Sequence, residues 1–213
     1  MTIDRGRLAG ASLLLGSVLC LAGYTAADVV AGTSGTARFT NPLFVPLYTV
    51  AMAGNLFLLL GLPVILVAHA KRAFWLTTIG YAGTVLAMAM LNIGEGTIEA
   101  FVEPYLATHG GIPAVGPAGF EGWLYVGMAF VLIGLVPLGV AVIRARAFPR
   151  WVGALLILSA PFGVVELPGP LFMLGDYLFF IAFAVMGLMI AAGLNARPAV
   201  VQKNLAPTPQ PSD

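Results

Sequence analysis

The sequence predicts an all-α polytopic membrane protein, a bundle of six transmembrane helices with both termini in the cytoplasm. Of the 213 residues, 60% are hydrophobic and only 9% are charged, whereas an ordinary soluble domain carries about 25% charged residues. The mean hydropathy is +0.97. Six apolar runs come close to the roughly 20 residues with which a helix crosses a bilayer. We expect helices because lipid offers the backbone no hydrogen-bond partner.

The connections between these runs predict how the helices are joined. The first run follows a basic N-terminus and is long enough to be a retained span rather than a cleaved signal peptide. The short basic segments His69–Arg72 and Arg144–Arg150 should each close an antiparallel hairpin, whereas Gly94–Gly122 is the longest connection. One transmembrane domain is expected over residues 1–197, and the proline-containing segment 198–213 is expected to be a disordered cytoplasmic tail. The predicted spans are Leu8–Ala27, Leu47–Ala68, Phe74–Ile93, Leu124–Ile143, Trp151–Leu167 and Tyr177–Leu194.

Charged residues divide between the two ends of the predicted spans. Lys and Arg mark cytoplasmic loops, so the basic end should face inward across the cytoplasmic (inner) membrane of the cell. Carboxylates contribute little to orientation, so their concentration at the outer end needs another reason. Only Arg38, Asp4 and Asp213 break the division. The basic group is Arg5, Arg7, Lys71, Arg72, Arg144, Arg146, Arg150, Arg197 and Lys203, and the acidic group is Asp28, Glu95, Glu99, Glu103, Glu121, Glu166 and Asp176.

The residue inventory argues against several kinds of site. The one cysteine, Cys20, cannot form a dithiol redox centre. The two histidines, His69 and His109, should lie on opposite sides of the membrane, so they cannot jointly bind a haem or a zinc ion. We therefore expect no metal and no cofactor. A basic groove with interleaved aromatic residues is also missing, so nucleic acid is not an expected partner.

Three glutamates follow the third span at intervals of four residues. If the helix continues past Gly94, then Glu95, Glu99 and Glu103 share one face and drift by roughly 40° per step. Like charges at this spacing repel slightly, so the stripe does not serve helix stability. An amphipathic helix lying at the outer interface with its glutamates in water is the alternative.

Two more acids come from later spans. Sixteen residues separate Arg150 from Glu166, which is only about 24 Å of helix, so Glu166 should lie slightly below the outer surface. A carboxyl group at that depth would face the bundle interior and could hold a proton at neutral pH. The alternative is a plain helix end in the outer loop. Asp176 opens the sixth span, where capping of the helix is the simpler explanation.

Other polar groups at the outer side could line a pocket beside these acids. Asn92 lies about one turn before Glu95 and could orient it, while interhelical hydrogen bonds are the ordinary role of asparagine within a span. Pro63 and Pro137 should kink the second and fourth helices and could leave a cavity that opens outward. The candidate ligand-binding residues are Asn92, Glu99, Tyr48, Tyr125, Tyr177 and Asn55.

One functional prediction is an enzyme in which Glu95, Glu166 and Asp176 carry metal-independent acid/base chemistry on a small lipophilic substrate. The segments Asn92-Ile93-Gly94-Glu95 and Gly175-Asp176-Tyr177-Leu178 resemble those of the small integral-membrane terpene cyclases, which place one acid on an early helix and one on a late helix. This resemblance covers under a tenth of the chain and implies isoprenoid cyclisation or isomerisation. The sequence departs from that family in lacking an aromatic residue beside the early glutamate and one further span.

Two other classes of function remain open on the sequence alone. The acids could capture a cation or a basic lipophile and exchange it for a proton, as in a carrier or binding protein. The chain could also be a structural accessory subunit whose apolar faces pack on other membrane proteins. The expected partners are membrane lipid and a small lipophilic molecule, and a homo-oligomer is compatible with the apolar faces.

Overall fold

The computed structural model describes residues 4–33, 35–69, 73–113, 116–165, 171 and 173–194. Within these residues every regular element is a helix. The elements are α1 (Arg5–Ala31), α2 (Thr36–Thr40), α3 (Phe44–Gly61), α4 (Pro63–His69), α5 (Phe74–Ala87), η1 (Met88–Glu95), η2 (Ile98–Val102), α6 (Glu103–Thr108), α7 (Phe120–Ala145), α8 (Arg150–Phe162) and α9 (Leu174–Ala191).

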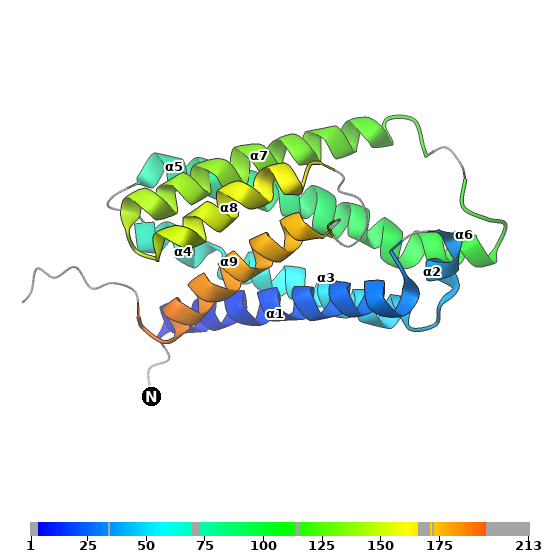
Figure 1. Cartoon of the computed structure of the whole chain (residues 1–213), viewed down its shortest axis with the longest axis horizontal. Coiled ribbons are helices and arrows are strands. Elements are labelled where there is room, and N and C mark those ends of the chain that lie inside the picture. The colour runs from blue at the N-terminus through cyan, green and yellow to red at the C-terminus, as the bar shows by residue number, and fades with distance from the viewer. Residues whose placement is uncertain are drawn as a thin grey trace, which may run out of the picture.

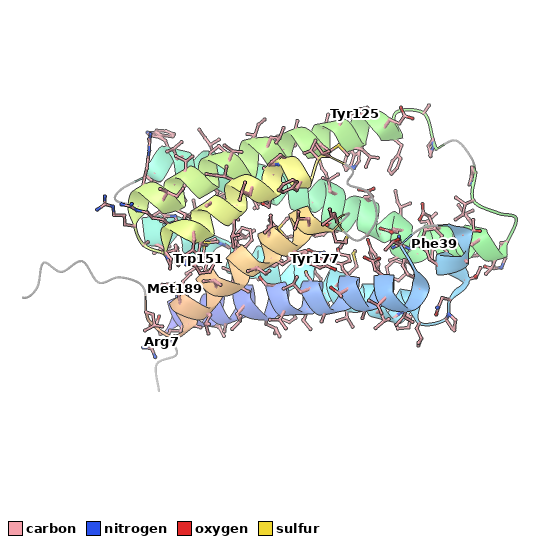
Figure 2. All side chains as sticks on the ribbon, viewed as in Figure 1. Arg7, Phe39, Tyr125, Trp151, Tyr177 and Met189 are labelled. Atoms are coloured by element: carbon pink, nitrogen blue, oxygen red, sulfur yellow. The ribbon has the colours of Figure 1, made fainter. Side chains whose placement is uncertain are left out.

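Five helical segments are long and apolar enough to cross a membrane. They are Arg5–Ala31, Phe44–His69, Phe74–Thr108, Phe120–Ala145 and Leu174–Ala191. Large apolar side chains are exposed along them, as lipid contact requires, and Figure 2 shows side chains on all sides of the bundle. The protein is therefore a multi-pass helical membrane protein. The fifth predicted span, Trp151–Leu167, forms only the 13-residue helix α8, about 20 Å long, so the count of six spans stays a prediction.

The helices form a ring around the molecular interior. Helix α1 packs against α3 and α9, α5 against α7, α7 against α8, and α8 against α9, while α3 meets η1 and η2. Figure 1 shows the start of α1, the end of α9, the α4–α5 connection and the α7–α8 connection at one end of the bundle. Helices α2 and α6 lie at the opposite end. The basic residues at the start of α1 and around the α7–α8 connection therefore lie at the first end, whereas Glu103 lies on α6 at the other, the acidic end.

Glycines let the neighbouring helices approach closely. A Cβ atom on Gly16 of α1 would lie 2.5 Å from the Leu58 nitrogen and 2.7 Å from the Gly54 oxygen of α3. A Cβ atom on Gly139 of α7 would lie 2.5 Å from the Gly153 oxygen of α8. Small residues of this kind favour helix association in lipid because close backbones gain van der Waals contact.

The third span is longer than predicted. Its helix does not end at Ile93 but continues through two π-helical segments, η1 and η2, to Thr108. The helix packs closely against α3 here, because a Cβ atom on Gly96 would lie 3.1 Å from the Met52 sulfur of α3. Pro104 lies in the first turn of α6, directly after η2, and does not end the helix. The first part of the predicted Gly94–Gly122 loop is therefore helical.

The two prolines inside predicted spans behave differently. Pro63 begins α4 directly after the one-residue break at Leu62, so the second span consists of two helices. Pro137 lies inside α7, which is one helix from Phe120 to Ala145. Of the two positions where a kink was predicted, the structure has a helix boundary only at Pro63.

Candidate functional site

A cavity of about 290 Å³ lies toward the acidic end of the bundle. Its wall is built from α1, α2, α3, α5, η1, η2, α7, α8 and α9, so nearly the whole ring contributes. The ionisable and amide groups that line it are Tyr24, Asp28, Arg38, Tyr48, Asn92, Glu95, Glu99 and Asp176. The larger apolar side chains that line it are Met88, Leu91, Met128, Val131, Leu135, Phe162, Val164, Val165, Met173 and Phe179.

A buried arginine organises one side of this cavity. The Nη2 atom of Arg38 lies 2.6 Å from Oε1 of Glu99 and 3.7 Å from Oδ1 of Asp28. Its Nη1 atom donates to the Thr33 carbonyl at 3.2 Å. The Tyr48 hydroxyl donates to the other carboxylate oxygen of Glu99. Four elements thus meet at one charge cluster: α1, α2, α3 and η2.

Aromatic rings surround the charge of Arg38. Its guanidinium carbon lies 4.8 Å from the ring centre of Phe44 and 5.3 Å from that of Phe39. The residue is only 8% exposed, and its Nε atom has no hydrogen-bond partner among the described residues. An arginine in such surroundings keeps its charge, because its guanidinium is not deprotonated in proteins. It therefore needs the carboxylates that contact it.

A second group of polar contacts supports the tyrosine wall. Asn55 is fully buried, and its amide nitrogen donates to the Tyr24 hydroxyl at 2.8 Å. The Cys20 thiol lies 3.4 Å from the Asn55 side-chain oxygen. The rings of Tyr24 and Tyr48 meet edge to face, with 5.1 Å between their centres. Because Tyr24 accepts from Asn55, its own proton is free to donate toward the cavity.

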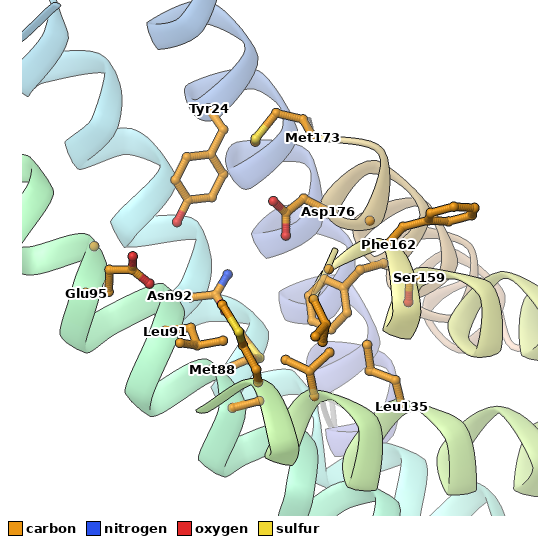
Figure 3. Close-up of a pocket in the computed structure, with 18 of the residues that line it drawn as sticks. Tyr24, Met88, Leu91, Asn92, Glu95, Leu135, Ser159, Phe162, Met173 and Asp176 are labelled. Carbon is orange, nitrogen blue, oxygen red and sulfur yellow. The ribbon is translucent and has the colours of Figure 1, made fainter. Parts of the chain in front are cut away.

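Glu95 and Asp176 face the cavity without such support. Figure 3 shows the side chains of Tyr24, Asn92, Glu95 and Asp176 directed into the same space. The side-chain carboxyl groups of Glu95 and Asp176 make no hydrogen bond or ion pair to any residue that the structure describes. Asp176 lies in the first turn of α9, but its side chain caps no described backbone group. Both carboxyl groups are therefore free to act on a bound molecule.

The structure brings together most of the residues that the sequence predicted for the site. Glu95, Asp176, Asn92, Glu99 and Tyr48 all line the cavity.

Other predicted site residues lie outside the cavity lining. Asn55 donates a hydrogen bond to the Tyr24 hydroxyl, which itself lines the cavity. The hydroxyl groups of Tyr177 and Thr25 form a hydrogen bond, with 3.3 Å between their oxygens. Tyr125 is 68% exposed on the outer surface. Glu166 lies outside the described residues.

Two charged residues of the cavity wall, Arg38 and Asp28, were not predicted as site residues from the sequence. Arg38 was noted only as an exception to the charge pattern, and Asp28 only as a member of the acidic group at the outer end. The signal was present, because a single basic residue among outer acids needs a counter-ion, and Arg38 is the one positive charge among the described residues of the cavity wall. What the sequence could not give was the fold of the α1–α3 connection that inserts it.

The cavity wall contains no group of three or more histidine, cysteine, aspartate or glutamate residues arranged to hold a metal ion, as far as the described residues go. The wall can instead offer carboxyl groups, phenol hydroxyls and an amide next to an apolar surface. Such a surface accepts the hydrocarbon part of a ligand, while the carboxyl groups accept or donate a proton.

Comparison of the chain with protein-family models, curated proteins and solved structures found no match.

Proposed function

We propose that this membrane protein binds a small lipophilic molecule in the cavity and exchanges protons with it through Glu95 and Asp176. One observation carries the proposal: two carboxyl groups without a described partner, from different helices, line a cavity whose remaining wall is largely apolar. Carboxyl groups within membrane helices are costly and usually face a functional cavity.

The preferred activity is metal-independent acid/base catalysis, such as isomerisation or cyclisation of an isoprenoid. One group, as a protonated carboxylic acid, would protonate an alkene carbon. The second, as a carboxylate, would remove a proton from the resulting cation. The ring faces of Tyr24, Phe162 and Phe179 could shield that cation in between. The predicted third acid of this chemistry, Glu166, remains part of the proposal as a sequence-based expectation.

Orientation is part of the same proposal. Since basic loops mark the cytoplasmic side, the acidic end and its cavity would open outward from the cytoplasmic membrane.

A carrier or binding protein for a cationic lipophile is the second candidate. It is favoured by the charge of the cavity wall, where the four acids Asp28, Glu95, Glu99 and Asp176 accompany the positive charge of Arg38. A bound amine could neutralise this excess negative charge in place of a proton.

The first test asks whether the cavity holds a lipophile. We expect mass spectrometry of the protein purified from membranes to find a co-purifying small lipophile, and Val131→Phe, which fills the cavity wall, to lower its amount several-fold. Ile133→Phe is the matched control, because Ile133 lies two residues away on α7 and is exposed to lipid. Equal occupancy in both variants would contradict the proposed pocket.

The second test separates catalysis from binding. Liposomes containing the protein would be incubated with farnesol, geranylgeraniol and squalene, and products followed by gas chromatography and mass spectrometry. Glu95→Gln and Asp176→Asn should each abolish turnover, whereas Glu121→Gln, an exposed acid outside the cavity, should not. If turnover is absent but cation uptake responds to Glu95→Gln, the carrier is favoured. No effect on either would leave the accessory-subunit alternative.

A further inference from the structure

We propose that Arg38 is a positioning residue that holds the Glu99 side chain in an ion pair, so that the exchangeable proton of the cavity resides on Glu95 or Asp176. This inference deepens the proposed function and rests on it for its catalytic meaning. It divides the cavity acids into a fixed anion and proton-exchanging groups.

The contacts of Glu99 leave no favourable place for a proton. One carboxylate oxygen lies 2.6 Å from Arg38 Nη2, and the other accepts the Tyr48 hydroxyl. Both oxygens therefore already serve as acceptors of strong, partly charge-assisted hydrogen bonds. Protonation of Glu99 would leave the Arg38 guanidinium with Asp28 as its one carboxylate partner, at a distance of 3.7 Å.

Arg38 is held in place by its own surroundings. It belongs to the short helix α2, which the α1–α3 connection folds over the acidic end (Figure 1). The Thr33 carbonyl fixes Nη1, and the rings of Phe39 and Phe44 flank the guanidinium. The charge is thus positioned by the fold of this connection rather than by Glu99 alone.

The other two acids, Glu95 and Asp176, lack the contacts that Glu99 makes. Glu95 lies about one turn before Glu99 on the same continuous helix, and Asp176 lies across the cavity on α9. Both face a fixed Glu99 anion, with Asp28 and Glu103 also nearby on α1 and α6, and Arg38 is already engaged. Several carboxylates that share one cavity repel each other, and a proton on one of them relieves that repulsion.

Labelling with dicyclohexylcarbodiimide tests this division without any ligand. This hydrophobic reagent adds to protonated carboxyl groups, and the adduct rearranges to a stable N-acylurea that peptide mass spectrometry locates. In the wild-type protein at neutral pH we expect labelling of Glu95, Asp176 or both, and only background labelling of Glu99. Exposed Glu121 is the internal control and should also stay at background.

Substitutions then test the role of Arg38. Arg38→Gln should raise Glu99 from background to a level comparable with Glu95, whereas Arg38→Lys, which keeps the charge, should leave the wild-type pattern unchanged. Glu99→Gln should reduce labelling of Glu95, because it removes the anion that favours a proton there and releases Arg38 from its ion pair. A purely structural role for Arg38 would change labelling of all acids alike, or none.

Several results would overturn the inference. They are labelling of Glu99 in the wild-type protein, absence of label on both Glu95 and Asp176, or an unlabelled Glu99 in monodisperse Arg38→Gln. If Arg38→Gln does not fold, the wild-type and Glu99→Gln patterns still decide. If the labelling pattern is as expected but no lipophile occupies the cavity, the division of the acids stands and the proposed ligand fails.

Discussion

At the scale of single residues, Asn55 makes the clearest prediction about stability. It is fully buried in α3 and bridges the Tyr24 hydroxyl and the Cys20 thiol of α1. Asn55→Ala should lower the free energy of unfolding by about 1–2 kcal/mol, because it leaves the Tyr24 hydroxyl buried without this partner. Titration with a denaturing detergent, followed by circular dichroism, measures the loss. In the double variant with Tyr24→Phe the loss should be smaller than the sum of the single losses, and strict additivity would contradict the bridge.

The same scale shows what sequence reasoning could and could not find. Glu95, Glu99 and Asp176 were predicted because acids gather at the outer end of the predicted spans, where membrane topology does not require them. The partnership of Glu99 with Arg38 could not be predicted, since it depends on how the residues between α1 and α3 turn back over the cavity. Tyr125 shows the converse limit, because an outer tyrosine can face lipid or a pocket, and only the helix rotation decides which.

At the scale of helices, the α1–α3 contact depends on glycine. A Cβ atom at Gly54 would lie 2.7 Å from the Cys20 nitrogen and sulfur and 2.8 Å from the Gly16 oxygen. Gly54→Val should therefore destabilise the protein by about 1–3 kcal/mol or more by forcing α1 and α3 apart, measurable by the same detergent titration. Gly122→Ala in α7 is the matched control, because nothing lies within 4 Å of its new Cβ atom. It should be neutral or slightly stabilising. Equal losses in the two variants would contradict the packing role.

Helix lengths were harder to predict than helix positions. Hydropathy placed the apolar runs, but α8 ends at Phe162, five residues before the predicted end. At this end of α8, Gly163 packs against the start of α9, where a Cβ atom on Gly175 would lie 2.5 Å from the Gly163 nitrogen. The third span, which continues to Thr108, likewise packs against α3 through η1. No local pattern reports either contact.

At the scale of the whole molecule, the arrangement of charge predicts the orientation. The start of α1 and the end of α9 lie at the basic end of the bundle, and the cavity lies toward the other (Figure 1). Because Lys and Arg are retained on the cytoplasmic side, Asp4 should lie inside and His109 outside. Neither Asp4 nor His109 is one of the Lys and Arg residues that set the orientation. Replacing either of them by cysteine should therefore leave the orientation unchanged. The native Cys20 is buried and gives little background. In intact cells, a membrane-impermeant maleimide should label His109→Cys but not Asp4→Cys, and lysis should expose Asp4→Cys. The reverse pattern would place the cavity on the cytoplasmic side, where its acids would meet ligands from the cytosol and the cytoplasmic leaflet.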